Sequence, residues 1–278
     1  MTEITNAQQT IEETRFTFGK NWADFLHNVG EVQIAEAEKS LKEWLQIESL
    51  SGKTFLDIGS GSGLASLVAQ RMNAKRVYSF DYDPQCVACT QELKQRYFPA
   101  NQSWIINRGS VLDETFLHSL GRFDVVYAFG VLHHTGDMWR AMENAILPVK
   151  RKGGILYVSI YNDQGKLSQW WAKIKRTYNI LPRSLRFIIL YPVLIMQWSP
   201  NMIRDFLHGK PFDTWRKYNK KRGMSAWYDI VDWAGGYPFE VAKPEQIFDF
   251  YTSRGFELKR IKTVGGHSAC NHYVFIRK

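Results

Sequence analysis

Cysteine is scarce in this chain of 278 residues, which contains only three. Cys86 and Cys89 have the spacing of a metal-binding pair, but no second pair follows them, and three thiols cannot build a disulfide framework. We therefore interpret the pair as one face of a helix in a reducing compartment and predict no metal site. The N-terminus lacks the apolar core of a signal peptide, which favours a cytoplasmic location.

Apolar runs long enough to cross a bilayer are also lacking. The run Phe187–Trp198 has twelve residues, whereas a membrane-spanning helix needs roughly twenty. We interpret it as part of a buried helix. A peripheral contact with membrane or lipid is the alternative, because basic residues stand on both sides of the run, at Arg183, Arg186, Arg204 and Lys210.

A glycine-rich turn follows the apolar run that begins at Phe55. A turn at the end of a buried strand needs residues that tolerate positive φ, and missing side chains let a ligand approach the backbone. Gly59, Gly61 and Gly63 meet both needs. A second apolar run ends at Asp81, 22 positions after Gly59, where a carboxylate can accept hydrogen bonds from ribose hydroxyls. The pattern predicts a nucleotide site.

Asp57 limits the kind of ligand that this turn can hold. A carboxylate directly before the turn would repel a pyrophosphate and attract a cationic group. The loop also lacks the Gly-Lys-Ser/Thr ending of a phosphate-binding P-loop. A cationic ligand is therefore favoured over a phosphate.

Apolar strand candidates alternate with helical stretches over the first 160 residues, as in a doubly wound α/β sheet. Ligands of such sheets bind beyond the carboxyl ends of the strands. Gly59, Asp81, Ser110 and Phe129 fall at these ends, so one crevice is expected to collect them. The composition, 45% apolar and 14% aromatic, suits one large domain with a sizeable core.

With these motifs the chain resembles the class I S-adenosylmethionine-dependent methyltransferases, over most of residues 50 to 160 and the C-terminal hairpin. It is similar to the small-molecule branch, which includes ubiquinone-biosynthesis-type methyltransferases. The resemblance implies a Rossmann-like doubly wound sheet whose sixth and seventh strands lie at 256–261 and 271–276, the seventh antiparallel. It also implies S-adenosyl-L-methionine as cofactor and methyl transfer as the reaction.

The same resemblance assigns cofactor contacts to the strand ends. In that family the first turn holds the methionine part of the cofactor, the acid after the second strand binds ribose, and the turn after the third contacts adenine. Many relatives carry Asp at the position of Ser110. Carried onto this sequence, the contacts are Asp57, Gly59, Ser60, Gly61, Gly63, Asp81, Tyr82, Ser110, Val111, Phe129 and Gly130.

Aromatic residues around Gly19 interrupt the helical pattern of the N-terminal segment. In such methyltransferases an N-terminal arm often lies across the cofactor, so Lys20, Asn21 and Trp22 are expected to close its pocket. An aromatic ring stabilises a desolvated sulfonium through its quadrupole. The alternative is that Phe16, Phe18 and Trp22 only fasten the first helices to the core.

His133 and His134 follow the fourth expected strand, where the resemblance places the methyl acceptor. A hydroxyl acceptor needs a base, and a histidine with an ordinary pKa of about 6.5 suits that role at neutral pH. We predict His134, and after it His133, as catalytic, with Tyr161 after the fifth strand as a further candidate. The alternative role for the pair is a loop and helix-capping element. Asp137 is expected to cap the helix that begins at Met138.

Three parts are expected along the chain. Residues 1–50 would form an N-terminal helical arm, 51–162 and 237–278 the Rossmann-like core, and 163–236 an inserted basic, aromatic-rich helical cap. Near its end the cap carries further candidates for the acceptor pocket, namely Tyr228, Asp229, Asp232 and Trp233.

Positive charge is concentrated in residues 150–225, which hold 16 Lys and Arg against three Asp. Such a segment attracts anions, and an anionic membrane surface, RNA or a merely solvated helical face are all compatible with it. We predict a methyltransferase acting on a small or lipid-linked acceptor, by O-methylation. The alternatives are an RNA (tRNA) methyltransferase that uses the basic cap and a non-catalytic cofactor-binding scaffold.

Overall fold

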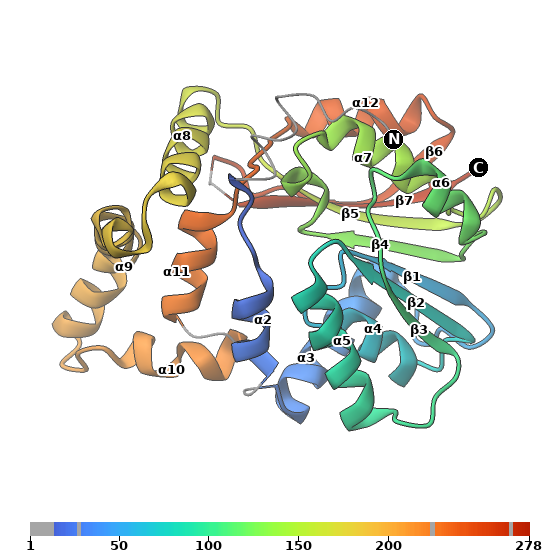
Figure 1. The fold of residues 1–278 in the computed structure, drawn as a ribbon, viewed down its shortest axis with the longest axis horizontal. Coiled ribbons are helices and arrows are strands. Elements are labelled where there is room, and N and C mark those ends of the chain that lie inside the picture. Colours follow the sequence, from blue (N-terminus) through green and yellow to red (C-terminus); the bar gives the residue numbers. More distant parts are fainter. Residues whose placement is uncertain (1–13, 27–28, 223–225, 267–268) are drawn as a thin grey trace.

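The computed structural model describes residues 14–26, 29–222, 226–266 and 269–278 (Figure 1). Residues 1–13 of the expected N-terminal arm and 223–225 of the basic segment lie outside the described residues. The oligomeric state was not predicted from the sequence.

Seven strands of the described residues form one mixed sheet, in the order β3-β2-β1-β4-β5-β7-β6. Strands β1 to β5 pair in parallel, and β7 runs antiparallel to both β5 and β6. The predicted Rossmann-like sheet with an antiparallel seventh strand is confirmed. The strands are β1 Thr54–Ile58, β2 Arg76–Asp81, β3 Trp104–Arg108, β4 Val125–Phe129, β5 Ile155–Tyr161, β6 Phe256–Lys262 and β7 Cys270–Arg277.

Helices cover both faces of this sheet, because successive side chains of a strand point to opposite sides. Phe55 and Val125 pack on one face with helices α3, α4 and α5, whereas Leu56 and Val126 pack on the other with α6, α7 and α12. The N-terminal helix α2 joins the first of these layers. The helices are α2 Gly19–Leu26, α3 Glu31–Leu45, α4 Leu64–Arg71, α5 Pro84–Tyr97, α6 Glu114–Ser119, α7 Met138–Ile146 and α12 Pro244–Thr252.

Four further helices stand beside the sheet, to the left in Figure 1, between β5 and α12 in the chain. Their buried residues, among them Trp171, Leu190 and Ile230, form a hydrophobic cluster of their own. The boundaries 163–236 expected for a cap stay a prediction. The four helices are α8 Lys166–Ile180, α9 Phe187–Leu207, α10 Asp213–Arg222 and α11 Ala226–Gly235.

Helix α9 is longer than the twelve-residue apolar run that it contains. It has 21 residues and continues to Leu207, with Pro192 and Pro200 inside it. The run is part of a helix, as predicted, and helical apolar positions such as Ile203 and Phe206 continue after it. The helix is not buried on all sides, because Tyr191 and Ile195 are 53% and 64% exposed. No helix in the described part of the chain is both long and apolar enough to span a membrane.

The expected interruption is present at residues 15–18, but it ends earlier than predicted, because α2 begins at Gly19 and includes Trp22. Gly19 serves close packing rather than a break. A Cβ there would lie 2.2 Å from Cβ of Gln85, and the Gly19 amide donates to Oδ2 of Asp83 at 3.1 Å. The glycine lets α2 begin directly against α5.

A lysine is buried inside the cluster formed by α8 to α11. Lys175 of α8 is 0% exposed, and its ammonium donates a hydrogen bond to the carbonyl of Trp233 near the end of α11. The ammonium also lies 4.3 Å from the centroid of the Trp233 ring and 4.9 Å from that of Phe239. Burial lowers the pKa of Lys175 from 10.5 to about 7.

Removing this lysine should change how stability depends on pH. Between pH 7 and 10.5 Lys175 keeps its proton in the unfolded chain but releases it in the folded chain. The free energy of unfolding therefore increases as the pH rises through this range. In Lys175→Met this gain, on the order of a few kcal/mol, should disappear. Urea unfolding at pH 7 and pH 9.5 measures it, with exposed Lys173→Met as control. Equal pH dependence in wild type and Lys175→Met would contradict the assignment.

Candidate functional site

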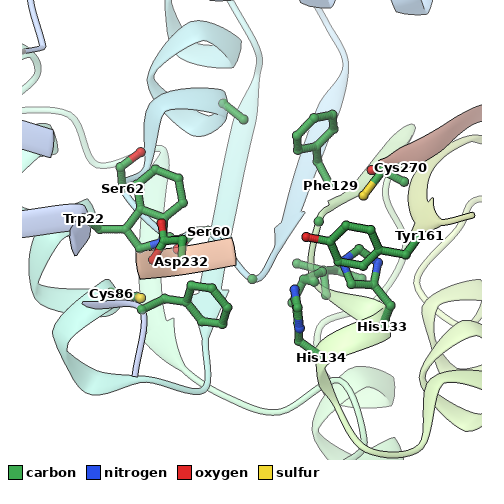
Figure 2. Close-up of a pocket in the computed structure, with 18 of the residues that line it drawn as sticks. Trp22, Ser60, Ser62, Cys86, Phe129, His133, His134, Tyr161, Asp232 and Cys270 are labelled. Atoms are coloured by element: carbon green, nitrogen blue, oxygen red, sulfur yellow. The ribbon is translucent and has the colours of Figure 1, made fainter. Parts of the chain in front are cut away.

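A cavity of about 2070 Å³ lies at the carboxyl ends of the parallel strands. It is lined by the loops after β1 to β5, by α2, and by residues of α8, α9 and α11 (Figure 2). The predicted site residues that line it are Trp22, Asp57, Gly59, Ser60, Gly61, Asp81, Tyr82, Ser110, Val111, Phe129, Gly130, His133, His134 and Tyr161.

Two of the predicted cofactor contacts, Gly63 and Lys20, are not among the described residues that line the cavity. Gly63 is not among the lining residues, and a Cβ at this position would lie 2.9 Å from Cα of Thr90. Its role in the structure is to let α4 begin close to α5. Lys20 belongs to α2, and its side chain lies outside the part that the structure describes.

The turn after β1 depends on glycine for both conformation and space. Gly59 and Gly61 have φ of 70° and 54°, in the left-handed region that favours glycine. A Cβ on Gly59 would lie 2.3 Å from Cγ2 of Val131, and one on Gly61 would lie 3.1 Å from the Trp22 ring nitrogen. The turn thus forms a cradle whose surface is backbone. A side chain at either glycine would collide with Val131 or Trp22.

Asp81 ties this turn to the end of β2. Its Oδ2 accepts the Gly61 amide at 2.9 Å, and its Oδ1 accepts the Asp83 amide at 2.9 Å. Burial raises the pKa of Asp81 to about 6, although the two amide donors act in the opposite direction. A carboxylate held in this way is fixed in orientation and has lone pairs left for ligand hydroxyls.

Asp57 lies beneath the turn and is only 2% exposed. Ser66 donates to its Oδ2 at 2.5 Å and lies 2.6 Å from the Ser79 hydroxyl, which accepts Nε1–H of Trp104 at 2.8 Å. Burial raises the pKa of Asp57 to about 7. The supporting residues come from three elements far apart in sequence, so no local signal could have identified them.

The turn after β3 contributes the next wall. The Ser110 hydroxyl accepts the Leu112 amide at 3.1 Å, and the Val111 carbonyl accepts the side-chain amide of Asn144 at 3.0 Å. Asp113 then caps α6 by accepting the Phe116 amide at 2.9 Å. The Ser110 side chain therefore shapes the turn itself.

The N-terminal segment crosses to both sides of the cavity. Arg15 donates to the carbonyls of His134 and Thr135 at 3.0 and 2.9 Å. Asn21 of α2 donates to the Asp232 carboxylate of α11. Sequence reasoning named Asp232 only as a possible lining residue and missed Arg15, because neither contact has a spacing signal.

Aromatic packing accompanies these hydrogen bonds. The rings of Phe16 and Phe18 lie 4.8 Å apart, and Phe18 lies 5.1 Å from the His134 ring. Trp22 lies 5.5 Å from Phe25 and also lines the cavity. The N-terminal segment thus packs against neighbouring aromatic rings and also lines the cavity.

His134 lies in a short 3-10 turn, Leu132–His134, after β4. Its Nδ1 lies 2.6 Å from the carbonyl oxygen of Pro238. A carbonyl can only accept, so Nδ1 carries the proton and Nε2 of the neutral ring is left as an acceptor. Burial lowers the pKa of His134 to about 3, so the ordinary value expected from the sequence is wrong.

His133 is 1% exposed, and burial lowers its pKa well below the usual value. Among the described residues its Nδ1 has no hydrogen-bond partner. The Tyr161 ring, at the end of β5, lies 4.3 Å from that of His133 and 5.6 Å from that of His134. Asp137 caps α7 by accepting the Arg140 amide at 3.3 Å, as predicted.

Two walls face each other across the cavity in Figure 2, with Trp22, Ser60 and Asp232 on one side and His133, His134 and Tyr161 on the other. Asp232 is mostly buried, and this burial raises its pKa to about 7. Among the described residues no group of three or more His, Cys, Asp or Glu side chains could hold a metal ion.

A family model described as "Methyltransferase domain" matches residues 27–223, more than half of the chain. Ribosomal protein L11 methyltransferase of Vibrio campbellii (strain ATCC BAA-1116) is 40% identical over 60 residues, 22% of this chain. The matched part spans 20% of that protein, so this likeness covers about a fifth of the curated relative.

Solved structures with the same fold cover almost the whole chain. Magnesium protoporphyrin IX methyltransferase (ChlM) from Synechocystis PCC 6803, with bound S-adenosylmethionine (SAM), has a TM-score of 0.55 at 12% identity and covers 100% of both chains. The N-methyltransferase NodS from Bradyrhizobium japonicum WM9, with S-adenosyl-L-homocysteine, has a TM-score of 0.51 at 13% identity and covers 94% of this chain and 99% of its own.

The glycine cradle and the carboxylates of Asp57 and Asp81 fit such a ligand, because they offer backbone contact, a counter-charge and acceptors for ribose hydroxyls. The chain belongs to the methyltransferase family and is an S-adenosylmethionine-dependent methyltransferase.

Proposed function

We propose that this methyltransferase transfers a methyl group to a hydroxyl oxygen of a small or lipid-linked acceptor. The observation that carries the proposal is the cavity of about 2070 Å³, which is larger than the roughly 300–1,000 Å³ of most ligand sites. It extends from the glycine cradle to the rings of Trp170, Trp171 and Trp233. A large cleft lined by aromatic rings suits an apolar or planar acceptor beside the cofactor.

The cofactor lies at the cradle end in this proposal. Asp81 accepts the ribose hydroxyls, and the backbone of Gly59 and Gly61 lies against the methionine part. Asp57 supplies negative charge near the cationic end, and the Trp22 ring closes the pocket above Gly61. The remaining contacts are assigned to Ser60, Tyr82, Ser110, Val111, Phe129 and Gly130.

S-adenosylmethionine supplies an activated methyl group on its sulfonium, so the protein must chiefly align the acceptor oxygen behind that carbon. Nε2 of His134 accepts the hydroxyl proton, because Nδ1–H is already donated to Pro238. The Tyr161 ring holds the acceptor beside it, and the buried His133 ring supports Tyr161 from behind, at 4.3 Å between ring centroids. Asp232 is the competing proton acceptor, since its pKa of about 7 is better matched to neutral pH.

Transfer of labelled methyl to a fractionated cell extract tests the acceptor class. We expect the label in the organic-soluble fraction, and the chemical shift of a ¹³C-methyl group to identify bonding to oxygen. Nuclease-sensitive label would support the RNA methyltransferase alternative, which the basic segment motivates. Label on nitrogen or carbon would overturn O-methylation while leaving the family unaffected.

Replacing Asp81 should weaken cofactor binding. Asp81→Asn removes a charged hydrogen-bond acceptor, and about 1.5–3 kcal/mol corresponds to a Kd roughly 10- to 100-fold higher. Isothermal titration calorimetry measures the change, with Asp249→Asn on the exposed side of α12 as control. An unchanged Kd would remove Asp81 from the ribose contact.

Cofactor binding should also release protons near pH 6. The pKa of Asp81 is about 6 in the structure, and ligand hydroxyls favour its ionised form, so affinity should fall as the pH drops from 7 to 5. Calorimetry in two buffers of different ionisation enthalpy counts the released protons. Proton release should decrease in Asp81→Asn, and an equal release in both proteins would contradict this linkage.

The pH dependence of turnover distinguishes His134 from Asp232. With a pKa of about 3, His134 is neutral at every pH above about 4, so a reaction that uses it shows no change near pH 6.5. His134→Gln should then lower kcat by about 10²–10⁴-fold. If Asp232 takes the proton, the rate instead rises through pH 7, and Asp232→Asn abolishes this rise.

A further inference from the structure

Exposed apolar side chains are concentrated on one part of the surface. Among the described residues, 11 of the 21 large apolar side chains that are exposed lie between positions 180 and 212. Phe206 and Leu207 are 74% and 76% exposed. Single exposed apolar residues are normal on proteins, whereas such a contiguous group marks a contact surface.

Helix α9 holds most of this group on one of its faces. Leu190 and Val193 are buried in the cluster with α8 and α11. Phe187, Tyr191 and Ile195, spaced four residues apart, are 52–64% exposed on the other side. The helix is therefore packed against the protein along one side and presents apolar side chains along the other. In Figure 1 it stands at the outer edge of the group formed by α8 to α11.

The charges around this face have one sign. Arg183 precedes α9, and Arg204 and Lys210 stand at its end, all three exposed. Asp205 is the single acid between positions 180 and 212. It is buried and accepts the amide and hydroxyl of Thr214 at 2.6 and 2.7 Å, where α10 begins. Its Oδ1 also lies 3.6 Å from Nη2 of Arg204. No further acid in positions 180–212 is present to oppose the exposed cations Arg183 and Lys210.

We infer that the exposed side of α9, residues 183–212, is a docking surface for an anionic lipid bilayer. Apolar side chains would enter the acyl boundary while the flanking cations meet lipid phosphates. A second copy of this chain fits less well, because it would bring the same cations together without acids. Nucleic acid would suit the cations but would leave the apolar side chains in water.

The docking surface adjoins the mouth of the cavity. Met196 of α9 belongs to the exposed apolar group and also lines the cavity. Leu167 and Trp170 of α8 are half exposed and line the same cavity. A lipid-linked acceptor can therefore pass from the leaflet into the cavity along an apolar edge. This step rests on the proposed acceptor class, whereas the docking itself does not.

Co-sedimentation of the whole chain with vesicles tests the surface. We expect binding to vesicles of phosphatidylcholine with phosphatidylglycerol, weakening with added salt, and much weaker binding to phosphatidylcholine alone. The triple variant Ile195→Ser, Phe206→Ser, Leu207→Ser should lower the partition coefficient at least tenfold. Its matched control changes three exposed apolar residues elsewhere, Val32→Ser, Phe248→Ser and Ile261→Ser, and should bind like the wild type.

A charge variant separates the two contributions. Arg183→Gln with Lys210→Gln should weaken binding to the anionic vesicles by about fivefold per charge, with little change on phosphatidylcholine. Cofactor affinity, measured by calorimetry, should stay unchanged in every variant and so reports that each is folded. Wild-type-like vesicle binding by the triple variant, or a dimer that this variant abolishes in sedimentation velocity, would overturn the docking surface.

The two proposals can fail separately. Vesicle binding together with label on a water-soluble compound or RNA would keep the docking surface and reject a lipid-linked acceptor. Label on a lipid without any vesicle binding would keep the lipid-linked acceptor and reject the docking surface.

Discussion

The Asp81 carboxylate joins the two turns on which the site depends. By accepting the amides of Gly61 and Asp83, it holds the turn after β1 against the end of β2. Because both donors are backbone groups, the geometry is set by the course of the chain rather than by side-chain rotamers. The position of the Trp22 ring above Gly61 follows from the same turn.

The core fold could be predicted because its signals are local. Alternating apolar runs, a glycine turn after the first strand and an acid at the end of the second are readable from neighbouring residues, and all seven expected strands are present in the sheet. The capping role of Asp137 was readable for the same reason. By contrast, the apolar run of α9 was interpreted as buried, whereas Tyr191 and Ile195 are more than half exposed. A run that is apolar on all sides does not show which of its sides is covered.

The supporting contacts of the site could not be predicted, because they join elements far apart in the chain. The hydrogen bond from Asn21 to Asp232 spans more than two hundred positions, and the Ser66 contact to Asp57 depends on how α4 packs over β1. The pKa of His134 was misjudged for a related reason. Its value depends on burial, which the sequence around a residue does not reveal.

The contact between Gly59 and Val131 has a consequence for how such an enzyme can change. A Cβ at position 59 would lie 2.3 Å from Val131, and Val131 is two positions before His133 in the loop after β4. In the proposed arrangement, the cofactor pocket and the acceptor pocket therefore share a wall. Redesigning this loop to admit a new substrate would disturb the glycine turn proposed to bind the cofactor. Selectivity for the methyl acceptor is therefore more freely altered from the α8 and α9 side of the cavity.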